Sequence, residues 1–211
     1  VWSGIGLLAG SLPAGVIADR FPNKSVIVSV LTLNLTIATA TSTAAILDIV
    51  TFWMLAVSAF IIGTSTAFFF PAYTALVPVL VDGDDLMAVN GLEGAARPLV
   101  GQAIAPAAVG AVIGASMPAA GGYLIAGALG LALIAALRLP APCSAETDAE
   151  APATSALRDL LDGFGYVART RWVRSSVLLA AAMGLAVTGP LEVLLPAVIR
   201  STHDNGPAVY G

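Results

Sequence analysis

Two oppositely charged residues, Glu93 and Arg97, lie four positions apart inside a long apolar stretch of this sequence. A carboxylate followed by a guanidinium at this spacing forms a favourable pair on one face of a helix. Such groups cost about 2.5–3.5 kcal/mol each in the middle of a membrane, so they face a cavity or a partner. Asn90 and Gly101 share the same helical stripe. The stripe therefore predicts either a proton or substrate site or a structural ion pair between helices.

Glu192 is the second intramembrane carboxylate, and no Lys or Arg lies within a turn or two of it along the chain. A carboxyl group without a counter-charge in a low-dielectric site takes up a proton more readily than it does in water. The preceding Gly189-Pro190 lacks one helical hydrogen bond and can open the helix there. Glu192 is therefore a candidate proton carrier, the alternative being an interfacial acid near the outer headgroups.

A short charged turn follows the first apolar stretch and contains Asp19, Arg20 and Lys24. A carboxylate and two cations at the mouth of a helical bundle can exchange partners when two bundles rock, which is the chemistry of a gate. The simpler alternative is a basic turn that only sets the topology. Arg20 could pair with the next acidic loop, whose carboxylates are Asp82, Asp84 and Asp85.

An aromatic run, Phe68-Phe69-Phe70 with Tyr73, belongs to another apolar stretch. These rings either line an apolar substrate path or pack against lipid.

The composition requires lipid around the elements that carry these residues. Of 211 residues, 58% are hydrophobic and 10% are charged, whereas a soluble domain has about 25% charged residues. Crossing the hydrocarbon core takes about 20 apolar residues in a helix. Six segments fit this length, the first of them cut short, and we expect an all-α polytopic membrane protein. They are Val1–Ile17, Ser25–Leu47, Ile49–Val79, Leu86–Ala115, Pro118–Leu137 and Trp172–Ile199.

The distribution of basic residues predicts the topology and the domain limits. The Arg20–Lys24 turn and the segment 138–174 hold nearly all Lys and Arg residues, so both are expected to be cytoplasmic. We expect an N-terminal bundle over 1–139, a Pro- and Ala-rich cytoplasmic linker over 140–171, and a further helix with an outer loop over 172–211. The tryptophans fall at expected span ends, as an aromatic belt requires; they are Trp2, Trp53 and Trp172.

Other partners find no support in the sequence. The net charge is −4 and no basic run is long enough to bind nucleic acid. Cys143 is the single cysteine, so neither a disulfide framework nor a thiolate metal cluster is expected, and no cofactor is predicted.

The charged turn resembles the cytoplasmic signature of the major facilitator superfamily, G-x-x-x-D-R-x-G-R-R/K. The matching residues are Gly15, Asp19, Arg20 and Lys24, whereas Pro22 and Asn23 replace a glycine and an arginine. The resemblance implies that the Asp19 carboxylate latches onto the other half of the transporter in its outward-facing state.

The fourth apolar segment is similar to the antiporter signature of the same superfamily, G-x-x-x-G-P-x-x-G-G. Gly101, Pro106 and Gly110 match it, and Ala105 and Val109 depart from it. Shorter stretches at 70–72, 76–78, 88–92 and 189–196 are similar to the branch of enterobactin exporters and macrolide-efflux pumps.

The resemblance implies a partial major facilitator fold, with helices two to seven of twelve and the remainder of the same polypeptide missing. It implies a bacterial inner-membrane carrier that exports an amphiphilic drug, macrolide or siderophore in exchange for protons, by alternating access. A proton-coupled uptake carrier on the same fold is one alternative. A polytopic membrane enzyme with Mg²⁺ at Asp82-Gly83-Asp84-Asp85 is another, although no second acidic cluster accompanies that motif.

Overall fold

A computed structural model describes residues 1–81, 83–140, 165, 168–184 and 186, and omits the side chains of residues 12, 15, 16 and 18–20. The described part is helical and contains no strand, which confirms the all-α fold class. Four of its helices are long and apolar enough to cross a membrane: Asn23–Ile46, Phe52–Leu80, Leu86–Ala115 and Pro118–Arg138. The first helix, Trp2–Arg20, has 19 residues and is not among these four.

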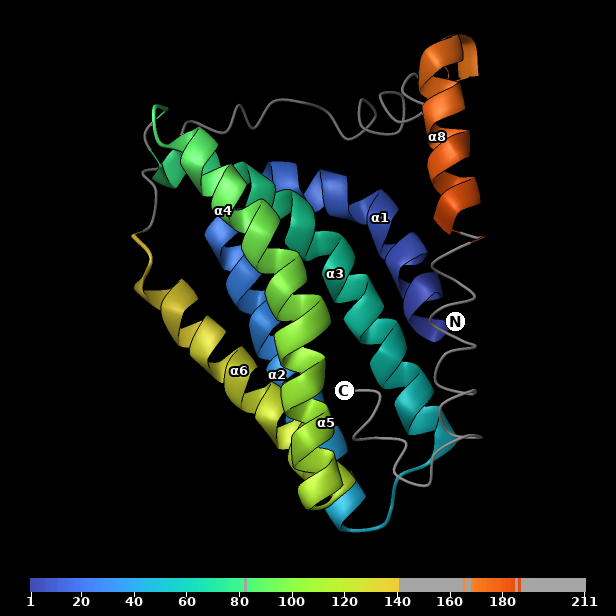
Figure 1. Ribbon diagram of the computed structural model, residues 1–211, viewed down its shortest axis with the longest axis vertical. Helices are drawn as coiled ribbons and strands as arrows, with labels where there is room; N and C mark the ends of the chain where they lie inside the picture. Colours follow the sequence, from blue (N-terminus) through green and yellow to red (C-terminus); the bar gives the residue numbers. More distant parts are fainter. Residues whose placement is uncertain (82, 141–164, 166–167, 185, 187–211) are drawn as a thin grey trace. The chain divides into compact units, whose positions relative to one another are not determined.

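The chain divides into two compact units, one over Val1–Thr147 with Gly211 and one over Asp148–Tyr210. The first unit contains α1 (Trp2–Arg20), α2 (Asn23–Ile46), α3 (Phe52–Leu80), α4 (Leu86–Pro98), the π-helix η1 (Leu99–Ile104), α5 (Ala105–Ala115) and α6 (Pro118–Arg138) (Figure 1). The second unit contributes α8 (Arg171–Met183). The predicted limits of bundle, linker and final helix stay a prediction, and most of the predicted linker lies outside the described residues.

A turn and a helix cap make α3 begin later than the sequence analysis predicted. The third span was expected from Ile49, but the helix begins at Phe52. Asp48 has a positive φ of 53°, a conformation that Asp tolerates better than most residues. Thr51 then caps the helix, because its side-chain oxygen accepts a hydrogen bond from the Met54 backbone N–H at 3.3 Å. The turn and cap together move the helix start by three residues.

Helices α1 and α3 run parallel and touch along a seam of small residues. A Cβ on Gly6 would overlap the Phe60 carbonyl, and a Cβ on Gly63 would overlap the Ser3 carbonyl. The Thr64 hydroxyl donates a hydrogen bond to the Gly6 carbonyl oxygen at 3.1 Å. Glycine is needed at these positions because the two backbones approach closely, as small residues permit in membrane helices.

The rings of Trp2 and Trp53 lie 6.3 Å apart at the starts of α1 and α3. Both tryptophans therefore occupy helix ends on one side of the bundle, where the sequence placed them. Trp172 is the second residue of α8. These positions agree with an interfacial aromatic belt.

Helices α2, α3 and α6 enclose the apolar core of the first unit. Its buried residues are Val26, Ile27, Val30 and Leu31 of α2, Ala72 and Leu76 of α3, and Ala136 of α6. At the other end of α2, the hydroxyls of Thr43 and Tyr123 form a hydrogen bond of 2.8 Å to α6. These contacts fix α2 and α6 antiparallel (Figure 1).

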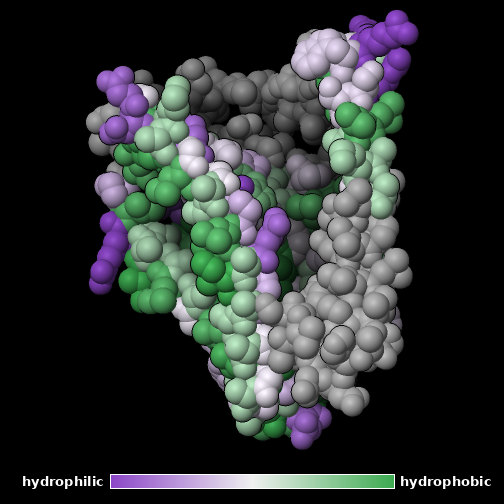
Figure 2. Space-filling model, in the orientation of Figure 1, coloured by the Kyte–Doolittle hydropathy of each residue, from purple (hydrophilic) through white to green (hydrophobic). Residues whose placement is uncertain are grey.

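The helical stretch 86–115 begins and ends where the sequence predicted, but it is not a uniform α-helix. Six residues, Leu99–Ile104, form the π-helix η1 directly after Pro98. Neither α4 nor η1 has a buried residue, and Gly110 alone is buried in α5. Figure 2 shows hydrophobic side chains over much of the face formed by α4, α5 and α6. This stretch is therefore the least enclosed part of the described first unit.

Candidate functional site

The structure forms the ion pair that the sequence predicted between Glu93 and Arg97. Both residues lie on α4, one helical turn apart, and an Arg97 terminal nitrogen (Nη2) donates a hydrogen bond to Glu93 Oε1. The Arg97 side chain is 51% exposed and the Glu93 side chain 26% exposed. Arg97 thus remains about half exposed while one of its terminal nitrogens holds the carboxylate.

Two aromatic rings of α3 lie beneath the Arg97 guanidinium. Its carbon Cζ is 5.1 Å from the centre of the Phe70 ring and 6.0 Å from the centre of the Tyr73 ring. A guanidinium within about 6 Å of an aromatic face is attracted by the ring quadrupole. The charge on α4 is therefore held against α3 as well as against its own helix.

The Tyr73 ring also stacks against a neighbouring ring of α3. Phe69 stacks on it with ring centres 5.6 Å apart and planes inclined by 13°. Arg97 Cζ lies 6.0 Å from the centre of the Tyr73 ring, and Glu93 is paired with Arg97. The aromatic run thus forms part of a polar cluster, which neither the lipid-facing nor the apolar-path interpretation included. Tyr73 and Phe70 are spaced i,i+3 on one helix face, but the sequence cannot show that α4 packs there.

The rest of the predicted stripe on this helix is only partly preserved. Asn90 is exposed on α4, one turn before Glu93. Gly101 lies inside η1, where the wider i→i+5 turn rotates the chain relative to an α-helix. The stripe therefore keeps its α-helical spacing from Asn90 to Arg97 only. Two prolines eight positions apart, Pro98 and Pro106, are the sequence signal for this irregular segment.

Pro106 and Gly110 of the antiporter-like motif follow in α5. Pro106 is near the start of α5, but α5 continues η1 without a break, so the missing backbone N–H of Pro106 leaves a carbonyl of η1 without its helical hydrogen bond. Gly110 is buried. The neighbouring turn of α5 packs on α6, because a Cβ on Gly121 would come within 2.7 Å of the Ile113 side chain. Pro106 and Gly110 thus lie in the C-terminal part of the stretch 86–115, and this part packs against α6.

The charged turn is described only in part. Gly15, Asp19 and Arg20 belong to α1, but their side chains lie outside the described part, as does Asp82. Lys24 is in the first turn of α2, and its ammonium donates hydrogen bonds to the carbonyl oxygens of Leu137, at 3.1 Å, and Leu139. Lys24 therefore ties α2 to the C-terminal end of α6, which also satisfies carbonyls that the helix leaves free.

Glu192, the second candidate carboxylate, lies outside the described residues, together with Gly189-Pro190. Among the residues that are described, no three His, Cys, Asp or Glu side chains converge as a metal site would require.

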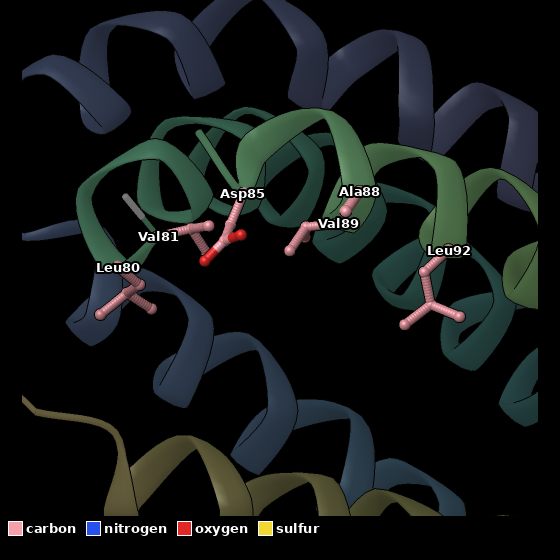
Figure 3. A pocket seen from close by; sticks show the side chains of 6 residues that line it. All are labelled: Leu80, Val81, Asp85, Ala88, Val89 and Leu92. Carbon is pink, nitrogen blue, oxygen red and sulfur yellow. The ribbon is translucent and has the colours of Figure 1, made fainter. Parts of the chain in front are cut away.

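A hollow of about 410 Å³ lies where α3 ends and α4 begins. Figure 3 shows six side chains around it, and among these labelled residues Asp85 is charged and the others are apolar. The lining residues are Leu80, Val81, Asp85, Ala88, Val89 and Leu92. Asp85 lies two helical turns before Glu93, so the hollow and the ion pair follow each other along α4.

The sequence profile of a major facilitator family, described as transmembrane secretion effectors, matches residues 3–211. The chain belongs to this family. Neither a curated protein nor a solved structure matches it significantly. Membership of the transmembrane secretion effector family makes the chain a membrane transporter of the major facilitator type, with an all-helical partial fold and several membrane-crossing helices. The Glu93–Arg97 cluster is then a charged site within a helix of a secretion effector.

Proposed function

We propose that this protein is a secondary active transporter that exports an amphiphilic small molecule in exchange for protons, by alternating access. The observation that carries the proposal is the Glu93–Arg97 pair on a membrane-crossing helix with little burial. At 1.5 Å per residue, Arg97 lies roughly 18 Å along the helix from Asp85. Charges at that depth have a use when they face a water-filled path for a substrate.

The two candidate carboxylates take different roles in this proposal. Glu93 accepts a hydrogen bond from Arg97, so its carboxylate is already engaged in a charged pair. We therefore assign the Glu93–Arg97 pair to contact with the transported molecule. Glu192 has no nearby cation in the sequence and is assigned the coupling proton.

The charged turn is assigned the gate at the cytoplasmic end. Lys24 already joins two helices there through the carbonyl oxygens of Leu137 and Leu139. We propose that Asp19 and Arg20 exchange partners between the two halves of the transporter as it opens and closes. The second half comes from the remainder of the same polypeptide. The proposed location is a bacterial inner membrane, and the proposed substrates are drugs, macrolides or siderophores.

The test uses everted membrane vesicles that contain the full-length polypeptide. The assay follows accumulation of a macrolide, a catecholate siderophore and a cationic dye after an acid-inside gradient is imposed. We expect accumulation of at least one compound, loss on adding a protonophore, and a fall of tenfold or more in Glu192→Gln and Asp19→Asn. Asp48→Asn, a charge change in the exposed turn before α3, serves as the control.

Two results would contradict the proposal. Gradient-driven movement out of everted vesicles would make the protein an uptake carrier. Accumulation that ignores the protonophore, or proceeds unchanged in Glu192→Gln, would remove the coupling role of that carboxylate.

A further inference from the structure

The cluster on α3 and α4 has two side chains that remain partly exposed, Arg97 and Phe70. Arg97 is 51% exposed and Phe70 is 42% exposed. The two groups are adjacent, since Cζ of Arg97 lies 5.1 Å from the Phe70 ring centre. A cation beside an apolar aromatic surface offers two complementary contacts to one small molecule.

From this arrangement we infer that Arg97 and Phe70 form a recognition site for a cargo that carries an acidic group next to a flat aromatic ring. The inference rests on the proposed transport function and specifies its substrate class. A carboxylate or phenolate of the cargo would accept hydrogen bonds from Arg97, and its ring would pack on Phe70.

The charges at the site favour an anion over a cation. Arg97 has five N–H donors in a planar fork, and Glu93 engages one of its terminal nitrogens. The remaining donors can bind a second carboxylate, a geometry that guanidinium groups favour. A cationic cargo would have to reach Glu93, which is less exposed, at 26%, and is already paired with Arg97.

The aromatic rings also hold Arg97 in place before a ligand arrives. Phe70 and Tyr73 attract the guanidinium from below, and Phe69 stacks on Tyr73. A side chain that is fixed in its binding geometry loses less conformational entropy when the ligand binds. Tyr73 and Phe69 are therefore positioning residues for Arg97.

Glu93 acts as an internal competitor for the same guanidinium. The cargo anion and the Glu93 carboxylate compete for hydrogen bonds from Arg97. Removing the charge of Glu93 should therefore strengthen binding of an anion. If the ion pair is purely structural, removing the charge of Glu93 should instead weaken binding of the anion, as removing Arg97 does.

The test measures binding to the full-length protein in phosphatidylcholine nanodiscs without any ion gradient. The probes are dansylglycine, which is an aromatic acid, dansylamide, which is neutral, and dansylcadaverine, which is cationic. Their fluorescence rises on entering an apolar site. We expect dansylglycine to bind at least about tenfold more tightly than either of the other probes, as a charge-assisted contact would give.

Four variants divide the site into its parts. Arg97→Gln should weaken dansylglycine about tenfold or more and leave dansylamide unchanged, with Arg97→Lys in between. Phe70→Leu should weaken both probes several-fold, and Glu93→Gln should tighten dansylglycine several-fold. Arg138→Gln and Phe52→Leu are matched controls, because both residues are exposed and lie outside the cluster.

Equal binding of dansylglycine and dansylamide to the unaltered protein would overturn the inference, and that comparison needs no variant to fold. Weaker dansylglycine binding in Glu93→Gln would also overturn it and leave a structural ion pair. Gel filtration identifies variants that have unfolded. Since the assay uses no gradient, selective binding without proton-driven transport would contradict the proposed function while supporting this site.

Discussion

The α1–α3 seam and the α4–η1 stretch of the first unit hold their helices in opposite ways. In the seam, Gly6 and Gly63 allow backbone to meet backbone, with no room for a methyl group. Along α4 and η1, no residue is buried, and the described contacts to α3 include Arg97 above two rings. Close glycine packing yields a fixed pair of helices, whereas a charge held over aromatic faces can change partners.

The two regions of this transporter therefore differ in role, one giving rigidity and the other carrying the charged site. The seam and the core of α2, α3 and α6 supply a rigid support. The stretch α4–η1 carries the charged site and is interrupted by a π-helix, an irregularity that is frequent at functional positions. Mutations should therefore affect stability in the seam and substrate handling on α4.

The largest effect is expected for Gly63→Ala, because its Cβ would overlap the Ser3 carbonyl of α1. Overpacking of this kind costs about 1–3 kcal/mol and more where backbone must shift. Tryptophan fluorescence during unfolding in detergent should show a clear loss of stability. Gly94→Ala on α4 is the control, since no described atom lies within 4 Å of its Cβ. It should be neutral or gain up to about 1 kcal/mol from helix propensity. A loss in Gly94→Ala as large as in Gly63→Ala would abolish the contrast.

A smaller effect is expected for Pro98→Ala at the start of η1. Proline inside a helix costs about 3 kcal/mol, because it removes the hydrogen bond to the carbonyl four residues earlier. The π-helix η1 begins only after Pro98, so it does not replace that bond. We expect the variant to gain about 1–2 kcal/mol of stability while transport falls several-fold, as the helix becomes more regular. Pro106→Ala, at the junction of η1 and α5, should gain stability by a similar amount, because α5 continues η1 and the new backbone N–H can donate within the helix. If transport in Pro98→Ala stayed unchanged, the π-helix would have no part in function.

The smallest effect on stability is expected for exchanging the two charges, Glu93→Arg with Arg97→Glu. The i,i+4 pair remains, although in its less favourable order, so the loss from the pair and from the ring contact together should stay within about 1 kcal/mol. The guanidinium would leave Phe70 and Tyr73, and binding of dansylglycine should fall about tenfold. Unfolding midpoints and probe titrations on the same samples separate the two quantities. Retained binding would show that the position of the cation above the rings does not matter.

The sequence alone determined that the chain is an all-α membrane protein and where most of its helices lie. Apolar runs of about 20 residues with scarce charge cross a membrane as helices, which satisfy all their backbone hydrogen bonds internally. The stretch 86–115 and the start of α6 at Pro118 were predicted to the residue. The start of α3 was placed three residues early, because hydropathy does not register the Asp48 turn or the Thr51 cap. The Glu93–Arg97 pair was also readable, since its partners share one helix.

Tertiary structure decided which residues join that pair. Phe70 and Tyr73 precede Arg97 by more than 20 positions, and only the tertiary structure brings their rings under the guanidinium. The glycine seam likewise depends on α1 meeting α3 at Gly6 and Gly63. Helical periodicity orders residues within one element. Contacts between elements depend on which faces meet, and in a membrane nearly every face is apolar, so hydropathy alone cannot choose among them.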